Sequence, residues 1–352
     1  MREIEALWED VRELTLGNTS RIERLTSPPS PLRFLRDFVS LNKPCIISNA
    51  TLHWPALHLW RSDDYLTGSL SSSTVSVHLT PDGRADALAL NPAEPPPSLC
   101  FASAETRRLP FPEALDLIHR SNAGDNFVAY AQQQNDCFRS EYSALGSDCD
   151  SHIQWASEAL GCLPEAVNLW IGTHWSETSF HKDHYENLYA VVCGEKHFLL
   201  LPPTDVHRMY IGEYPAAQYL YSEETGEFKL ELEEPKRWVP WCSVNPNPSQ
   251  EDLDSEMEKF PLYFNGPKPF ECTVKPGEVL FLPSMWFHHV RQSPDDRGLT
   301  IAVNYWYDMQ YDMKYAYFNF LQSIQYQSLP DPSANETESE EIIKPVIGND
   351  FR

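Results

Sequence analysis

One short stretch of the chain indicates its architecture: Gly277-Glu278-Val279-Leu280-Phe281-Leu282-Pro283-Ser284-Met285-Trp286-Phe287-His288. It begins at a turn, continues as an apolar run, and places a histidine five residues after a proline. This order predicts a tight turn, a short strand, and a histidine that is carried onto the following strand.

Similar runs recur from about residue 165 onwards. Short apolar or alternating segments follow one another, separated by turn residues such as Cys193-Gly194-Glu195 and Pro276-Gly277. The segments are Val167–Ile171, Asn187–Cys193, His197–Leu201, Cys272–Val274, Val279–Leu282 and Leu299–Tyr305. This rhythm predicts an antiparallel barrel or jelly roll over about 165–308, and therefore a mainly β fold.

Helices are expected around this barrel. Helical spacing of apolar residues predicts a helix over 1–26, and the proline-rich break that follows it closes the N-terminal region 1–31. The other expected elements are helices over 32–41, 112–119 and 311–325, strands over 45–47 and 127–130, and a loop over 81–98. We expect one domain over 32–328 and a flexible acidic tail over 329–352.

The composition limits the classes of function. The chain has 352 residues, 27 Lys+Arg against 51 Asp+Glu and a formal charge of −24, which argues against neutralising nucleic-acid phosphates and favours a basic partner. No run of 18 apolar residues is present, so no membrane-spanning helix is expected. The 8 cysteines form no C-x-x-C pair, which is typical of reduced thiols in the cytosol or nucleus.

Much of the excess acid lies in one insert within the barrel region. Residues 211–260 contain 12 acidic and 4 basic side chains. The segment is either a solvated loop that keeps the protein soluble or a lip that attracts a basic substrate.

A candidate metal site begins at His181-Lys182-Asp183. Residues i and i+2 of a strand point to the same side, so this imidazole and this carboxylate would project together. Combined with His288, they would give two histidines and one carboxylate, the facial triad of non-heme Fe(II) oxygenases. Oxygen and nitrogen donors without thiolates suit Fe(II) better than a structural zinc site.

The stretch ending at His288 closely matches the second metal-binding motif of cupin barrels. Met285 replaces the glycine that usually lies two positions after the proline, which leaves the local turn geometry open. His289 competes as a ligand, but adjacent strand residues face opposite sides and the motif spacing favours His288.

Several segments together strongly resemble the JmjC-domain oxygenases, from about Leu32 to Gln325. They are His181 to Tyr189, Gly194-Glu195-Lys196-His197-Phe198, Trp286-Phe287-His288-His289-Val290 and Val303 to Asp308. The likeness is greatest to the small jumonji domain-containing lysyl hydroxylases. The resemblance implies a double-stranded β-helix with N-terminal helices and a C-terminal helix, which binds Fe(II) and 2-oxoglutarate and uses O2.

The resemblance also implies roles for individual residues. His181, Asp183 and His288 would hold the iron, and Lys196 would pair with the far carboxylate of 2-oxoglutarate. Tyr130 and Thr178 would donate hydrogen bonds to that same carboxylate. Two asparagines, Asn187 and Asn304, would line the co-substrate pocket. Two further residues, Tyr189 and Trp306, either line that pocket or form the barrel wall.

Three functions remain open on these grounds. The first is hydroxylation of a lysine side chain in a basic protein substrate, and the second is demethylation of methyl-lysine on a histone-like tail. The third is a non-catalytic jelly roll that binds partners through its acidic insert. The aromatic C-terminal helix either packs on the barrel or forms the face of a homodimer. P-loops, nucleophile elbows and dinucleotide fingerprints are absent from the sequence.

Overall fold

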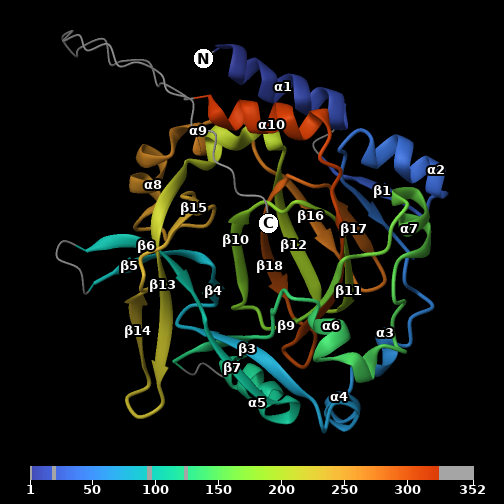
Figure 1. Cartoon of the computed structure of the whole chain (residues 1–352), viewed down its shortest axis with the longest axis vertical. Helices are drawn as coiled ribbons and strands as arrows, with labels where there is room; N and C mark the ends of the chain where they lie inside the picture. Colours follow the sequence, from blue (N-terminus) through green and yellow to red (C-terminus); the bar gives the residue numbers. More distant parts are fainter. Residues whose placement is uncertain (1, 18–20, 93–96, 123–125, 325–352) are drawn as a thin grey trace.

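Two sheets that enclose a common interior form the centre of the molecule (Figure 1). The computed structural model describes residues 2–17, 21–92, 97–122 and 126–324. The larger sheet has the order β1 (Glu23–Leu25), β2 (Cys45–Ile47), β17 (Val279–Leu282), β11 (Tyr185–Cys193), β19 (Thr300–Asp308) and β9 (Ala166–Gly172). The smaller has the order β16 (Phe270–Val274), β12 (Glu195–Leu201), β18 (Phe287–Ser293), β10 (Glu177–His181) and β4 (Arg84–Ala85). The sequence-based prediction of a jelly-roll fold is confirmed.

Side chains from both sheets meet in the space between them. Val191 and Leu280 come from the larger sheet, Phe198 and Leu200 from the smaller, and all four are buried in one apolar cluster. Because side chains alternate between the faces of a strand, the same strands also present a second face outwards.

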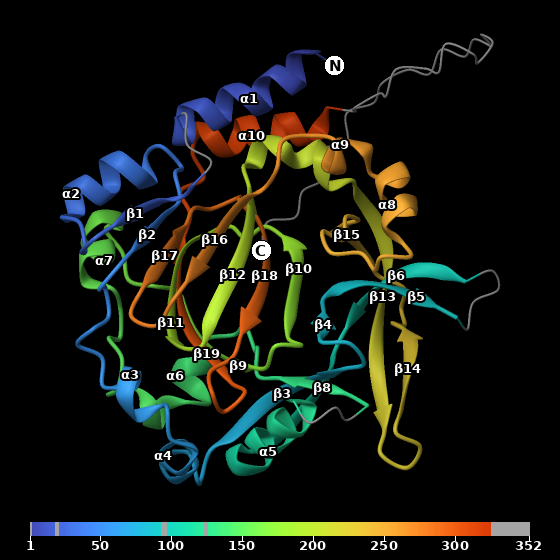
Figure 2. The same ribbon diagram turned by 180° about the vertical axis from the view of Figure 1, so that it is seen from behind.

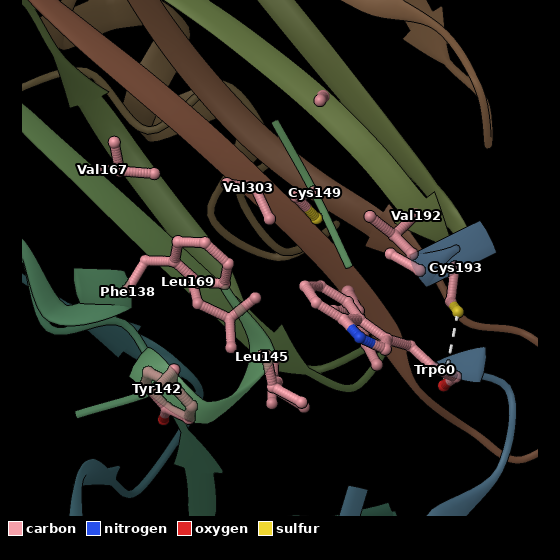
Figure 3. Close-up of a cluster of buried hydrophobic side chains, with 14 of the residues drawn as sticks. Trp60, Phe138, Tyr142, Leu145, Cys149, Val167, Leu169, Val192, Cys193 and Val303 are labelled. Carbon is pink, nitrogen blue, oxygen red and sulfur yellow. Dashed lines mark hydrogen bonds between the residues drawn. The ribbon is translucent and has the colours of Figure 1, made fainter. Parts of the chain in front are cut away.

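Helices and loops cover that outer face of the larger sheet. They are α2 (Pro31–Phe34) with the π-helical turn Leu35–Val39, α3 (Ala56–Leu59), α4 (Asp63–Ser69), α6 (Cys137–Ser140), the 3-10 turn Ser143–Leu145 and α7 (Gln154–Leu160). Figure 3 shows Trp60 and Phe138 packed against Leu169 and Val303 of this face. The Cys193 thiol donates to the Trp60 carbonyl across 3.7 Å. Burying each such apolar side chain contributes about 1.5–3 kcal/mol, so this layer is a main source of stability.

The N-terminal helix is shorter than the sequence predicted. Helix α1 (Arg2–Leu16) ends ten residues before the predicted limit of 26, and residues 23–25 form strand β1. Strand β1 pairs in parallel with β2, and the Arg24 side chain binds Glu278 and the Thr273 carbonyl. Pairing with a distant strand therefore overrides the local helical pattern in this segment.

The predicted loop over 81–98 was also wrong, because it contains strands β4 and β5 (Ala87–Asn91). Strand β4 extends the smaller sheet by parallel pairing, with Ala85 opposite Thr178. Strand β5 pairs instead with β6 (Ser98–Ser103). At residue 86 the chain thus leaves the edge of the smaller barrel sheet and enters a separate sheet outside the barrel.

The acidic insert contains three strands and a helix rather than forming a loop throughout. It provides β13 (Ile211–Ser222), β14 (Glu227–Leu232), β15 (Trp238–Cys242) and α8 (Leu253–Lys259), and α9 (Pro261–Phe264) follows the insert. Strand β13 pairs with β6, β14 and β15, so the insert forms a sheet together with the β5–β6 hairpin. Figure 2 shows this sheet beside the barrel, next to β4 and β10.

The remaining elements close the two ends of the barrel. A small sheet is formed by strands β7 (Glu105–Pro110), β3 (Thr74–Thr80) and β8 (Val128–Tyr130). Helix α5 (Phe111–Asn122) contacts all three of these strands. At the other end, α10 (Met313–Ser323) lies beside α1 in both views, and both contact the 3-10 helix Pro203–Met209 (Figures 1 and 2). No helix within the described ranges is both long and apolar enough to cross a bilayer. The predicted tail 329–352 lies outside the described residues.

Candidate metal centre

Three side chains from two distant parts of the sequence converge at one end of the barrel interior. His181 ends β10, Asp183 follows in the next turn, and His288 lies on β18 directly opposite His181. Their ligand atoms all lie within 4.8 Å of one another. Asp183 Oδ2 is 3.8 Å from His181 Nε2 and 3.7 Å from His288 Nε2. The structure thus brings together the three residues predicted as the metal triad.

Backbone carbonyls orient both imidazole rings. The Nδ1 atom of His181 lies 2.9 Å from the Ser179 carbonyl, and that of His288 lies 3.1 Å from the Trp286 carbonyl. Donation from Nδ1 leaves Nε2 free to bind a metal, which is how such contacts fix the tautomer of a ligating histidine. Burial lowers the pKa of His288 to about 4, so its ring is neutral and ready to bind a metal at physiological pH.

The structure shows the geometry of the turn at Met285, which the sequence left open. Met285 has φ +69°, so it adopts the left-handed backbone conformation that glycine provides in the usual motif. A side chain in this region costs about 1–2 kcal/mol. The Met285 amide donates to the Asp183 carbonyl at 2.8 Å, which joins this turn to the other half of the triad.

A buried carboxylate holds the same turn from the opposite side. Glu186 accepts hydrogen bonds from the Ser284 amide at 3.2 Å and from the Ser284 hydroxyl at 2.9 Å. Desolvation raises the pKa of Glu186, although these two donors act in the opposite direction. Sequence reasoning missed Glu186, because its partner lies 98 residues further along the chain.

His289 faces away from the triad, as alternation along a strand requires. It is buried, and its Nε2 lies 2.9 Å from Glu177 Oε1 on the neighbouring strand β10. The two adjacent histidines therefore have different environments, and the structure brings His288 rather than His289 to the other two ligands.

The donor set of this centre fits Fe(II). Two imidazole nitrogens and a carboxylate oxygen converge from the protein, and the described residues bring no thiolate into the group. This combination on one side of an ion is the facial arrangement that leaves the other coordination positions open.

Lys196 lies deeper in the barrel and is buried without an acidic partner. Its side chain is 1% exposed, and Nζ donates to Tyr130 Oη at 2.9 Å. Nζ also lies 5.3 Å from the ring centre of Tyr130 and 6.0 Å from that of Tyr189. Burial lowers the pKa of Lys196 to about 7, and no carboxylate among the described residues opposes this effect. A buried lysine of this kind fits the remote carboxylate of 2-oxoglutarate, because an anion would supply the missing partner.

Most of the predicted pocket residues line one narrow cavity beside the triad. Its lining comprises Gln134, Trp170, Thr178, His181, Asp183, Asn187, Tyr189, Phe198, His288, Val290, Asn304 and Trp306. The cavity measures about 20 Å³, which is room for about one water molecule. A dicarboxylate therefore requires lining side chains to move apart, while Lys196 and Tyr130 lie just beyond the lining in the present arrangement.

Hydrogen bonds fix the two predicted asparagines. Asn304 donates to Asn187 Oδ1 at 3.3 Å and accepts from Trp170 Nε1 at 2.8 Å. Sequence reasoning missed Trp170 and Gln134 as pocket residues. Trp170 lies in the predicted strand Val167–Ile171, where alternation alone could have assigned it to the barrel interior.

Comparison with known proteins agrees with this geometry. The model of the cupin-like domain family matches residues 31–313. Lysine-specific demethylase JMJ32 of Arabidopsis thaliana is 64% identical over 327 residues, which cover 93% of this chain and 92% of that protein. The human bifunctional peptidase and (3S)-lysyl hydroxylase JMJD7 is 45% identical over 304 residues, or 85% of this chain and 88% of that protein. JmjC domain-containing protein E of Dictyostelium discoideum is 37% identical over 322 residues, 88% of this chain and 89% of that protein.

Proposed function

The chain belongs to the cupin-like JmjC oxygenases, and from this premise we propose that it hydroxylates a lysine side chain of a protein, using Fe(II), 2-oxoglutarate and O2. One observation carries the proposal: a His-Asp-His triad lies at the cavity, and a buried lysine beyond its lining has no acidic partner among the residues that the structure describes. The first fits a metal and the second fits the far end of a dicarboxylate, so together they fit a chelating keto acid.

Each residue has a limited task in this reaction. Bound iron and 2-oxoglutarate supply the oxidation of a C–H bond, with loss of CO2 from the keto acid. His181, Asp183 and His288 hold the metal on one side. Lys196 and the Tyr130 hydroxyl bind the remote carboxylate, and Thr178 is proposed to donate to the same group.

The cavity wall excludes water and orients the co-substrate. Asn187 and Asn304 present amide groups beside the triad, and the Trp170 indole fixes the Asn304 amide. Tyr189 and Phe198 pack edge to face with ring centres 5.2 Å apart, and both line the cavity. Once the co-substrate is bound, a wall that excludes water holds the substrate carbon in place, and small displacements at this point cost much of the rate.

The name of one relative favours a second candidate function. The 64% identical protein from Arabidopsis thaliana is named a lysine-specific demethylase, whereas the 45% identical human protein is named a lysyl hydroxylase. The same centre serves either reaction, and the outcome depends on which carbon is held nearest the metal. In both cases we propose a basic, lysine-containing protein substrate in the cytosol or nucleus and one catalytic domain over 32–328.

The test uses the full chain with Fe(II), 2-oxoglutarate and a library of lysine peptides, each in unmodified and methylated form. Mass spectrometry that shows gain of one oxygen on unmodified lysine supports hydroxylation. Loss of a methyl group with release of formaldehyde supports demethylation instead. If neither product forms with any peptide while 2-oxoglutarate is also not consumed, the oxygenase proposal is wrong.

The matched variants are Asp183→Ala and Glu231→Ala, because Glu231 is an exposed acid of β14. The first removes one ligand of the triad and is expected to abolish iron-dependent turnover without unfolding the protein. The second is expected to leave both turnover and stability unchanged.

A further inference from the structure

Asp86 lies between the barrel and the insert sheet, where β4 ends and β5 begins. Its carbonyl accepts a hydrogen bond of 2.6 Å from the Ser179 hydroxyl, and the carbonyl of Ser179 contacts Nδ1 of the triad residue His181 at 2.9 Å. Ser179 therefore links the backbone of Asp86 to His181 of the metal centre.

The sheet formed by the acidic insert, through its strand β15, also contacts Ser179. Trp241 of β15 donates from its indole nitrogen to the Ser179 hydroxyl at 3.2 Å. Its ring is almost parallel to that of His181, at 4° and with ring centres 6.1 Å apart. Three segments distant in sequence, which are the β4–β5 junction, β10 and β15, thus meet beside this one metal ligand.

The Asp86 carboxylate has no protein partner in this position. None of the described residues gives it a hydrogen bond or an ion pair, and burial raises its pKa. The cationic or titratable groups that act on it are His78, His181 and Arg237. They are committed elsewhere, since Arg237 binds Glu233 through two hydrogen bonds of 3.0 and 2.8 Å and His78 lies 2.9 Å from Gln133 Oε1.

The backbone of Asp86 is also held in a costly conformation. Its φ is +52°, in the left-handed region, and its carbonyl is fixed by the contact with Ser179. Aspartate and asparagine tolerate this region better than other residues with a side chain. The contact with Ser179 thus holds the backbone of Asp86 close to the triad residue His181, whose charge acts on the Asp86 carboxyl group.

We propose that Asp86 determines specificity by accepting the ε-ammonium group of the substrate lysine while a carbon of that side chain lies at the metal. The proposal rests on the proposed function and names the group that recognises its substrate. An extended lysine side chain spans about 5 Å from Cβ to Nζ, so its charge must lie to one side of the reacting carbon. Among the described residues, none forms a hydrogen bond or an ion pair with the Asp86 carboxylate that a substrate ammonium group would have to displace.

This assignment also bears on the choice between the two reactions. An unmodified ammonium group has three N–H donors, and each added methyl group removes one of them. A carboxylate as the partner therefore favours unmodified lysine over trimethyl-lysine, as hydroxylation requires.

The test compares Asp86→Asn with the wild-type protein in binding two small probes. Asparagine preserves the size of the side chain and tolerates the left-handed backbone, so the fold is expected to persist. The probes are Nα-acetyl-lysinamide and Nα-acetyl-norleucinamide, which differ in the terminal amine. The full chain is loaded with Mn(II) and 2-oxoglutarate without oxygen, and the relaxation of probe protons near the paramagnetic ion gives affinity and location.

Wild-type protein is expected to bind the lysine probe about tenfold more tightly than the norleucine probe, because only the lysine probe can donate a charge-assisted hydrogen bond to the Asp86 carboxylate. Asp86→Asn is expected to lose this preference. A preference of equal size in both proteins, or no preference in the wild type, would overturn the assignment.

Asp82→Asn is the matched control, since Asp82 is an exposed acid four residues earlier that binds Arg84 at 2.8 Å. It removes the same charge from the same segment and is expected to keep the preference for lysine. Failure of the proposed function would look different, because no peptide would then gain oxygen or lose a methyl group with wild type or variant. If the wild type oxidises lysine peptides and the Asp86→Asn variant retains the full preference for the lysine probe, only the role of Asp86 is refuted.

Discussion

Two cationic side chains are buried in different parts of this protein, and they have opposite surroundings. Arg208 is fully buried and binds Asp205 together with the carbonyls of Leu262, Tyr263 and Pro267. Lys196 is equally buried, but its protein partner is the neutral hydroxyl of Tyr130.

The difference separates a structural cation from a binding cation. Burying a charge costs several kcal/mol unless opposite charge and hydrogen bonds compensate. At Arg208 the fold itself supplies that compensation. At Lys196 the fold leaves the cost in place, and an anionic ligand would recover it on binding.

The largest expected effect concerns Arg208→Met. Its removal leaves Asp205 and three carbonyls with fewer donors in a closed site, although Arg12 still binds Asp205 at 2.7 Å. We expect the free energy of unfolding to fall by about 3–5 kcal/mol, measured by urea denaturation. The affinity of the folded protein for 2-oxoglutarate should not change. A variant as stable as the wild type would show that Arg208 is not structural.

The next effect concerns Lys196→Met, which should weaken ligand binding without lowering the free energy of unfolding. Loss of the ammonium partner is expected to weaken 2-oxoglutarate binding by about thirtyfold or more, measured by calorimetry with the Mn(II)-loaded protein. The free energy of unfolding should stay constant or rise, because an isolated buried charge has been replaced by an apolar chain of similar length.

Lys275→Met serves as its control, because Lys275 is an exposed lysine whose side chain is 59% accessible. Neither affinity nor stability should change in this variant. If Lys196→Met instead loses as much stability as Arg208→Met, then the two cations have the same structural role and the comparison fails.

The smallest effect is a pH dependence that only Lys196 should confer. Burial lowers its pKa to about 7 in the protein without an anion, so the ammonium form is lost as the pH rises above 7. Affinity for 2-oxoglutarate should therefore decline about fivefold between pH 7 and pH 8, as the protonated fraction of Lys196 falls.

Stability should change in the opposite direction over the same range. An unfolded lysine keeps its proton up to a pKa of about 10.4, so the unfolded state binds more protons between about pH 7 and 10 and unfolding becomes less favourable as the pH rises. Urea titrations at several pH values measure this slope, and Lys196→Met should flatten both curves. An unchanged slope in that variant would assign the titration to another group.

Prediction from sequence was most successful where short-range geometry decides the outcome. His181 and Asp183 lie close together as predicted, although Asp183 follows the end of β10 rather than continuing the strand. Alternation along β18 correctly separated His288 from His289. The runs of β19 and β11 predicted strands, because a short apolar run bounded by turn residues is visible within a single segment.

Prediction failed where a partner far along the chain decides the structure. Residues 81–98 were expected to form a loop, yet β4 pairs with β10 and β5 pairs with β6. The helix expected up to 26 gives way to β1 because β2 provides a ladder beside it. The pairing partner of an edge segment is not encoded in its own periodicity.

The amino-acid sequence alone determined the barrel rhythm, the His-Asp-His set and the lysine that follows a turn, since each depends on residue type and local spacing. Tertiary structure decided how these residues are supported and what lies beside them. It gave Met285 a left-handed conformation joined to Asp183, left Lys196 with no acidic partner in the described part of the chain, and held the Asp86 carbonyl against Ser179, two residues before His181. The physical reason is that burial and the satisfaction of polar groups depend on every segment that packs around a residue, and those segments meet only once the chain has folded.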